Sequence, residues 1–479
     1  MSGHERPPDE RVEVSPDPRG PGKDDQMTIT AVLCEKIASA SYDDLGQSAI
    51  EAARRLVLDG LAIGLVGATE EEASAILAAH YREQGGAAQA TAIGHGFRLN
   101  TVSAAALNGA AMHVLDYEPM WSPANHALST TLAGTLALGE ALGSSGREIL
   151  TAFVKGIELQ GWIRQASGQY EATTMRLHAP GSAGPFGAAV AAGHLLGLGA
   201  DQLAHAIGIS ASRAASVLAN VGTMTKSTHC GHAASLGLEA ALLAARGFTA
   251  NADTFGARQG YADTFHADFK ADTLLGYGRP PWRIVTPGYA IKMFPSQYGT
   301  HFGITAALEL QSRIPSPSEI GSVRLTTPVM RYVDRPRPKS GLDGKFSIQY
   351  TAAAALLDGR VDISTFTDTR LFQPDMQALL EKIDVRQDPA IPGRFEDMHV
   401  DLSITLTDGR ILETRCAGPR GKWGTPPISA RDHLVKVRDC LGRWLTPAST
   451  EEIIGLASRI DALDAAGVRT LMQRVGCFV

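Results

Sequence analysis

Apolar residues recur at the three- and four-residue spacing of an α-helix through most of the chain between residues 28 and 276. Alanine, leucine and glycine dominate this part, and we find no segment that alternates apolar and polar residues as a strand does. Small residues let helices approach one another closely, so the pattern predicts a large bundle of mostly buried helices. The clearest helical patterns cover residues 49–61, 103–115, 130–142, 149–163, 187–196 and 233–245.

The pattern changes near Pro280 and Pro281, after which helical and strand-like segments are mixed. Asp408 and Gly409 form an Asp-Gly pair between two alternating segments, which is typical of a hairpin turn. This part therefore predicts a smaller α+β domain. Its expected elements are helices at 300–312 and 346–357 and strands at 322–327, 398–407 and 411–415.

The helical pattern returns after residue 425, and we expect the last helices to pack back onto the first domain. These helices are expected at residues 429–444, 449–460 and 465–475. The sequence thus predicts a mainly α protein, with one large helical domain built from both chain ends and a smaller inserted α+β domain. The predicted boundaries are 28–282 and 426–479 for the helical domain and 283–425 for the α+β domain. Residues 1–27 are polar and rich in proline and glycine, so we expect a disordered tail.

Composition narrows the possible functions. A net charge of −6 argues against nucleic acid or an anionic membrane as a partner, because both require broad basic surfaces. No apolar run reaches the roughly 18 residues that a membrane span needs, and we expect no signal peptide. The five cysteines are scattered and never in CxxC spacing, which argues against a disulfide framework or an iron-sulfur cluster and favours the cytoplasm.

Lys226 lies in a stretch rich in small residues between two apolar helical patterns. From Ala206 to Ala250 the only carboxylate is Glu239, so the nearby sequence offers no clear ion-pair partner. An unpaired buried ammonium is costly, and an anionic ligand would relieve that cost. A lysine that reaches solvent from a helix end, or that pairs with a distant acid, is the alternative.

Four other segments carry candidate chemistry. Asp116 ends a helical pattern and His126 precedes the next one, so the two could form a proton-transfer pair; a helix cap and a packed histidine are the alternative. His178 enters a glycine-rich turn whose backbone amides would suit a carboxylate. The remaining two segments contribute cations and hydroxyls from the second domain. Their candidate residues are Lys292, His301, Tyr332 and two arginines, Arg331 and Arg335.

A metal site is a weaker interpretation of the same region. His229 and His232 are three residues apart and would share a helix face, with Cys230 between them. No other cluster in the sequence supplies convincing further ligands. We therefore expect no metal.

Five segments together resemble the MmgE/PrpD family, which contains 2-methylcitrate dehydratases, cis-aconitate decarboxylases and iminodisuccinate epimerases. The resemblance covers nearly all of the chain after residue 27. It implies that the α+β domain is a lid, that the protein is a homodimer, and that a cofactor-free site lies between the domains. The matching segments are residues 108–126, 178–187, 222–233, 291–301 and 345–350.

The resemblance also implies which residues form the site. Lys226, Lys292 and His178 would stabilise negative charge, while His126 would transfer protons, with Asp116 orienting it and Tyr332 or His178 facing it. His301 matches a histidine of the family motif. The residues on pocket-lining positions are Asp116, His126, His178, Lys226, Lys292 and Tyr332.

Two departures from the family pattern bear on the reaction. The usual Asp-Phe-Asp-Asp-Thr reads Asp116-Tyr-Glu-Pro-Met120 here, which removes a hydroxyl. Gln297 stands where the decarboxylases usually have a histidine, and an amide cannot donate a proton as an imidazolium does. We therefore expect Gln297 to contact the substrate without transferring a proton.

The sequence favours a cofactor-free hydro-lyase that acts on a small di- or tricarboxylate of the 2-methylcitrate or citrate type. Epimerisation of a dicarboxylate and decarboxylation of cis-aconitate are the alternatives, since all three reactions pass through a carbanion-like species. A catalytically retired protein that only binds a carboxylate or a partner is a further alternative. The presence of Asp116, His126 and Lys226 argues against it.

Overall fold

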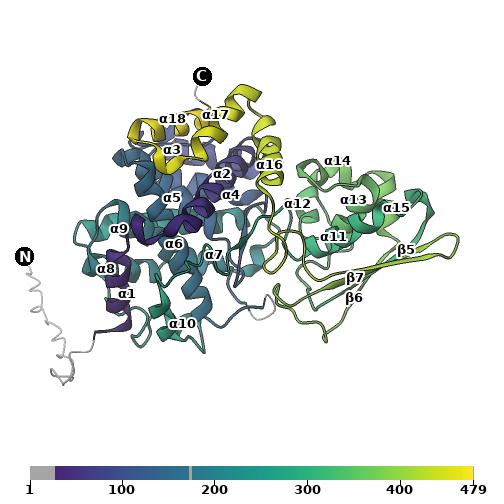
Figure 1. Cartoon of the computed structure of the whole chain (residues 1–479), viewed down its shortest axis with the longest axis horizontal. Coiled ribbons are helices and arrows are strands. Elements are labelled where there is room, and N and C mark those ends of the chain that lie inside the picture. The colour runs from purple at the N-terminus through teal and green to yellow at the C-terminus, as the bar shows by residue number, and fades with distance from the viewer. Residues whose placement is uncertain (1–26, 172–174, 478–479) are drawn as a thin grey trace, which may run out of the picture.

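The computed structural model describes residues 27–171 and 175–477, and helices dominate it (Figure 1). The prediction of a mainly α protein is confirmed. The predicted tail lies outside the described residues except for Met27. No helix within these two ranges combines the length and the apolar character that a membrane span requires.

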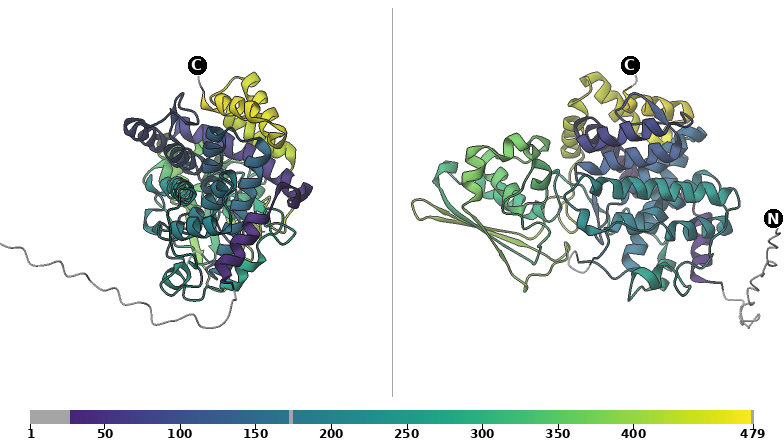
Figure 2. Two further views of the ribbon diagram at one scale, coloured as in Figure 1. Left: turned by 90° about the vertical axis from the view of Figure 1, so that its left-hand side faces the viewer. Right: turned by 180° about the vertical axis from the view of Figure 1, so that it is seen from behind.

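The N-terminal part forms a stack of helices that makes up the larger lobe (Figures 1 and 2). Helix α9 lies at its centre and contacts both α4 and α7 extensively. The helices are α1 Ile29–Ser39, α2 Gly46–Glu70, α3 Glu72–Gln84, α4 Thr101–Val114, α5 Ala127–Leu142, α6 Gly146–Ala166, α7 Ala179–Leu195, α8 Ala200–Ala211, α9 Thr225–Ala245 and α10 Tyr261–Phe265.

Two central helices begin earlier than the sequence pattern predicts, and both changes matter for the site. Helix α7 begins at Ala179, so the glycines that were expected to form a turn lie inside the helix. They are needed there for close packing, because a Cβ atom on Gly184 would lie 2.8 Å from side-chain atoms of Ala233 and Thr130. Helix α9 begins at Thr225, which places Lys226 in its first turn.

The smaller lobe packs helices against one face of a four-stranded sheet (Figure 1). The strand order is β6-β5-β7-β8, with β5 parallel to β6 and antiparallel to β7. The expected hairpin after Leu406 is present as β7 and β8, whereas β6 was not predicted, although its five residues alternate between apolar and polar. The elements are α11 Thr300–Gln311, β5 Ile320–Thr327, α12 Gly341–Gly344, α13 Ile348–Asp358, α14 Asp368–Leu371, α15 Pro374–Leu380, β6 Ile383–Gln387, β7 Val400–Leu406 and β8 Ile411–Cys416.

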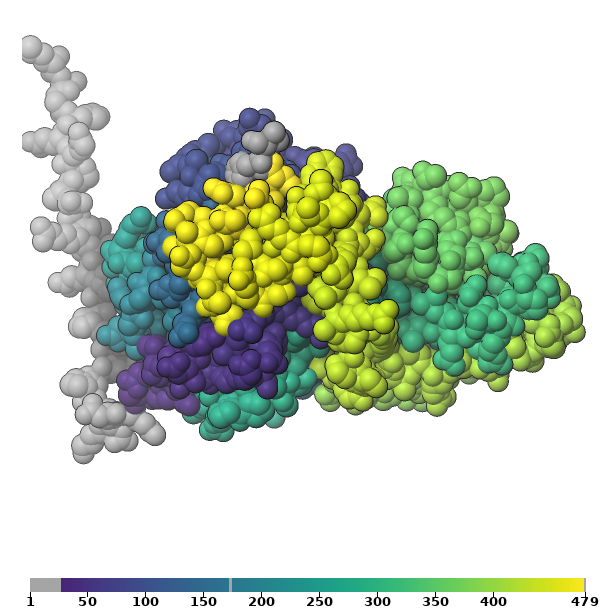
Figure 3. All heavy atoms as spheres, turned by 45° about the horizontal axis from the view of Figure 1, so that its top comes forward, coloured from purple at the N-terminus to yellow at the C-terminus, as the bar shows by residue number. Residues whose placement is uncertain are grey.

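The last helices return to the larger lobe. Helix α16 packs on α2, and α18 contacts α5. Figure 3 shows this C-terminal segment lying over the N-terminal helices, with the smaller lobe to one side. The helices are α16 Ala430–Gly442, α17 Pro447–Ala457 and α18 Ala465–Gly476.

Buried apolar side chains form two clusters. The first draws mainly on residues 33–284 and 437–475, and the second mainly on residues 290–416. Two-residue strands also occur, which the sequence pattern did not predict in the helical part. Of these, β3 Met120–Trp121 pairs with β4 Tyr289–Ala290 and so joins the helical part to the segment that leads into the smaller lobe. The other pair is β1 Ala90–Thr91 and β2 Arg98–Leu99.

Candidate active site

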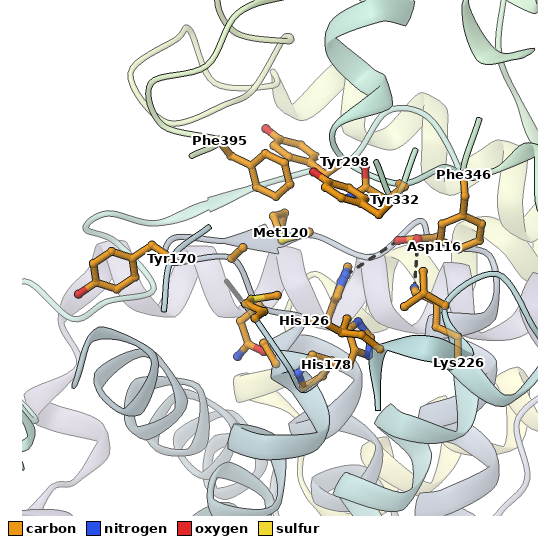
Figure 4. Close-up of a pocket in the computed structure, with 18 of the residues that line it drawn as sticks. Asp116, Met120, His126, Tyr170, His178, Lys226, Tyr298, Tyr332, Phe346 and Phe395 are labelled. Atoms are coloured by element: carbon orange, nitrogen blue, oxygen red, sulfur yellow. Dashed lines mark hydrogen bonds and ion pairs between the residues drawn. The ribbon is translucent and has the colours of Figure 1, made fainter. Parts of the chain in front are cut away.

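A pocket lies where the two lobes meet, and six of the eight residues selected from the sequence line it (Figure 4). Four of them come from the ends of helices in the larger lobe. The other two come from loops of the smaller lobe. The six are Asp116, His126, His178, Lys226, Gln297 and Tyr332.

The carboxylate of Asp116 is held between two ammonium groups. Lys226 Nζ lies 3.0 Å from Oδ2, and Lys292 Nζ donates to Oδ1. Asp116 follows α4 with a φ of 51°, a left-handed conformation that aspartate tolerates better than most residues. Burial opposes ionisation, but Lys226 and Lys292 together hold the pKa of Asp116 well below its usual range. The carboxylate is therefore ionised at neutral pH.

Lys292 lies behind Asp116 and does not line the pocket. Its side chain is fully buried, and besides Oδ1 it donates to the backbone oxygens of Asp116 at 2.9 Å and of Ser296 at 3.0 Å. All three N–H donors of the ammonium are thereby used. Burial is the main cause that lowers the pKa of Lys292 to about 8.

Lys226 differs from Lys292 because one of its three N–H donors has no acceptor among the described residues. Its ammonium bonds to Asp116 and lies 2.8 Å from Nε2 of His113, and no acceptor among the described residues takes the third N–H. The nearby sequence offers Lys226 no ion-pair partner, and Asp116, 110 residues earlier in the sequence, supplies one. The alternative of a distant acid is the one that the structure shows.

His113 and Glu118 complete the cluster, and the sequence analysis did not select either. Nδ1 of His113 lies 2.5 Å from Oε1 of Glu118, and Glu118 also accepts hydrogen bonds from the backbone and the hydroxyl of Ser129. Burial raises the pKa of Glu118 to about 7, against the effect of these hydrogen bonds. One signal was available, since His113 lies only three residues before Asp116, in the last turn of α4.

His126 has a ring nitrogen free for chemistry. It precedes α5, with Nδ1 at 3.7 Å from Glu118 Oε1 and Nε2 at 3.9 Å from Asp116 Oδ1, both longer than hydrogen bonds. Nδ1 is buried and has no hydrogen-bond partner among the described residues. Burial, together with the nearby His113 and Lys292, lowers the pKa of His126 well below its usual range, so the imidazole is neutral.

His178 faces the same space from the start of α7. Its Nδ1 lies 3.1 Å from Nδ1 of His229, and its ring centre lies 5.9 Å from that of His126. Burial and Lys226 lower the pKa of His178 well below its usual range. The pocket therefore holds two neutral imidazoles beside one ion pair.

The smaller lobe contributes neutral polar groups. The buried hydroxyl of Tyr332 has no hydrogen-bond partner of good geometry among the described residues, and burial raises its pKa. Oε1 of Gln297 accepts from the backbone N–H of Gly299 at 2.5 Å, which leaves the amide nitrogen of Gln297 as a donor. His301 lies in α11 outside the pocket lining, with Nε2 3.3 Å from the backbone oxygen of Ser296.

His229 and His232, the weaker metal-site interpretation, gather no third ligand among the described residues. A different set, His113, His126 and His178, has ring nitrogens within 4.8 Å of one another. Both nitrogens of His113 are already engaged, however, one by Glu118 and the other by the Lys226 ammonium. A cation placed there would also be repelled by Lys226.

Two family models match the chain along nearly all of the described residues. The MmgE/PrpD N-terminal domain matches residues 31–274, and the MmgE/PrpD C-terminal domain matches residues 294–462. The chain belongs to the MmgE/PrpD family.

Relatives within the family fall into two groups of enzymes. The chain is 30% identical to a cis-aconitate decarboxylase of Mus musculus over 459 residues, which cover 93% of each chain. It is 25% identical to a cis-aconitate decarboxylase of Aspergillus terreus over 94% of this chain and 96% of that one. It is 26% identical to a 2-methylcitrate dehydratase of Cupriavidus necator over 66% of this chain and 70% of that one.

The two departures from the MmgE/PrpD pattern both lie in the pocket. Met120 lines it from β3 and Gln297 lines it from the segment before α11. The methionine supplies an apolar surface where the family pattern has a hydroxyl. Met120 and Gln297 thus give this MmgE/PrpD pocket one apolar and one neutral polar contact.

Proposed function

We propose that this protein is a lyase that needs no cofactor and forms a carbanion next to a carboxylate of a small organic acid. One observation carries the proposal: His126, a neutral imidazole whose Nε2 lies 3.9 Å from Asp116, shares that carboxylate with Lys226, which has an unused N–H donor. A base next to a charge-stabilising donor is what carbanion formation requires. The family relationship supports the same class of reaction.

Dehydration is the first candidate reaction. In it, a ring nitrogen of His126 takes a proton from the carbon next to the carboxylate. The electron pair spreads into that carboxylate, whose growing negative charge accepts the free N–H of Lys226. The bond from the neighbouring carbon to its hydroxyl then breaks, and the electron pair forms the carbon–carbon double bond. Tyr332 retains its proton at neutral pH and gives it to the departing hydroxide, which leaves as water.

Decarboxylation is the second candidate, because the decarboxylase relatives match 93% or more of both chains whereas the dehydratase matches about two thirds. Here the bond to the leaving carboxylate breaks and carbon dioxide departs. The electron pair stays on the carbon skeleton until a proton joins it. Gln297 cannot supply that proton and His126 is neutral, so it would come from the hydroxyl of Tyr332.

Proton NMR in deuterated water tests the proposal. The substrates are citrate, 2-methylcitrate, cis-aconitate and a series of 2-substituted malates, each with the wild type and with His126→Gln. Alkene signals or deuterium at the carbon next to a carboxylate are expected with the wild type and lost with the variant. Deuterium uptake without elimination would identify an epimerase instead. If no substrate takes up deuterium or changes, the proposed function is wrong.

We also infer that the smaller lobe acts as a lid, that two copies assemble into a dimer, and that the protein works in the cytoplasm. The family resemblance supports the first two. Five cysteines without disulfides among the described residues support the third. Light scattering of the purified protein tests the dimer, and a monomer at micromolar concentration would contradict it.

A further inference from the structure

The pocket has two chemically different ends (Figure 4). Asp116, Lys226 and the two histidines gather at one end. Met120, Tyr298 and Phe395 lie toward the other, where the rings of Tyr298 and Phe395 meet edge to face with centres 5.2 Å apart. A ligand that fills the pocket must therefore be charged at one end and apolar at the other.

Positive charge in this pocket is scarce. Lys226 is the only lysine or arginine among the described residues that line it. The second lysine of the cluster, Lys292, has no donor left, and His126 and His178 are neutral. The lining can therefore pair one carboxylate with an ammonium group.

A second carboxylate can be held by neutral groups of the smaller lobe. The hydroxyl of Tyr332 and the amide nitrogen of Gln297 are both available as donors, as described above. Hydrogen bonds from such donors partly replace the hydration that a carboxylate loses on burial. No described lysine, arginine or histidine lines the end formed by Met120 and Phe395, where the one polar group of this trio is the buried hydroxyl of Tyr298. A third carboxylate there would therefore be buried without a cation.

We propose that the substrate is a dicarboxylate with a hydrocarbon substituent, and that Met120, Tyr298 and Phe395 hold this substituent. The proposal rests on the proposed lyase function, because it places the reacting carboxylate at Lys226. One carboxylate contacts Lys226, the second contacts Tyr332 and Gln297, and the substituent fills the apolar end. Tricarboxylates such as citrate fit this pocket less well.

Matched ligands test the proposal. Citrate and 2-benzylmalate share the hydroxyl-bearing carbon and two carboxylates, and they differ in whether the third arm ends in a carboxylate or a phenyl ring. Calorimetry with His126→Gln, in which turnover is blocked, measures binding alone. We expect 2-benzylmalate to bind about tenfold or more tightly than citrate. Equal binding, tighter citrate binding, or binding of neither ligand would overturn the proposal.

A charge placed at the apolar end should reverse the preference. In Met120→Lys the lysine stem follows the course of the methionine and brings an ammonium to that end, so citrate should gain about tenfold relative to 2-benzylmalate. Met120→Leu is the matched control and should keep the wild-type order. Phe395→Lys repeats the test if Met120→Lys fails to fold. An unchanged ratio in the folded lysine variants would contradict the assignment.

Measuring turnover distinguishes failure of the substrate proposal from failure of the proposed lyase function. If 2-benzylmalate binds selectively but neither it nor any other acid is converted or takes up deuterium, the substrate class stands and the lyase function fails. If the wild type converts citrate at least as efficiently as the substituted malates, the lyase function stands and the substrate class fails.

Discussion

Two buried carboxylates in the larger lobe have similar partners but different surroundings. Asp59 in α2 binds His433 at 2.9 Å and Lys436 at 2.9 Å, both from α16. Asp116 binds two lysines in the same way. The lining of the pocket includes Asp116 and Lys226 but no member of the Asp59 cluster.

The difference shows how a buried ion cluster is used for structure or for chemistry. Lys436 donates to Asp59 and to the backbone oxygen of Tyr117, so it joins α16 to the segment between Asp116 and Glu118. Lys226 instead keeps a donor that faces the pocket. A buried ion pair away from any pocket lining fixes a backbone, whereas one that lines a pocket with an unused donor can bind a substrate.

The largest effect should come from breaking the structural cluster. Lys436→Met leaves the buried Asp59 with only a histidine partner and should lower the free energy of unfolding by about 3–5 kcal/mol, measured by urea denaturation. The double variant Asp59→Leu, Lys436→Met removes both charges and should recover much of this loss. A loss below about 1 kcal/mol in the single variant would show that the two clusters do not differ as described.

Breaking the pocket cluster should affect catalysis more than folding. Lys226→Met leaves Asp116 paired with Lys292, so most of the stability should remain. We expect kcat/KM to fall by about 10²- to 10³-fold because the donor to the developing charge is lost. The measurement is steady-state kinetics beside urea denaturation. Activity within tenfold of the wild type would contradict the assignment of Lys226.

The pocket cluster should also make the stability of the protein depend on pH, through Glu118. The pKa of Glu118 is raised from 4.5 to about 7 in the folded protein, so the folded state alone holds the proton between these values. Stability from this group is therefore complete below pH 4.5 and falls as the pH rises toward 7, by up to about 3 kcal/mol.

Glu118→Gln is the matched variant for this prediction. Glutamine keeps the shape and a carbonyl acceptor for Ser129 but cannot ionise. Urea denaturation between pH 4.5 and 8 should therefore show a flatter stability profile in the variant than in the wild type. Parallel profiles for the two proteins would exclude Glu118 as the titrating group.

Much of the fold could be predicted because long helices bury a regular apolar face. The patterns at 103–115 and 149–163 correspond to α4 and α6 within a few residues at each end. The starts of α7 and α9 could not be predicted in this way, because their glycines and alanines are typical of loops as well as of closely packed helices. The contacts that require glycine there come from other helices, and local sequence does not contain them.

The site could be predicted as a set of residues but not as a set of contacts. Residue type and the family resemblance selected six residues of the pocket lining. Neither could show that Lys292 binds Asp116 from the side away from the pocket lining. Neither could show that Glu118, as well as Asp116, lies near His126. These relations depend on distances between helix ends, which the spacing of residues along the chain does not determine.

The short pairing of β3 with β4 brings together two segments that supply opposite charges to the site. Met120 and Trp121, just after Asp116 and Glu118, are bonded through the backbone to Tyr289 and Ala290, just before Lys292. The carboxylate of Asp116 and the ammonium of Lys292 are therefore carried by the two halves of one small ladder. A substitution that breaks this ladder would weaken the ion pair without changing either charged residue.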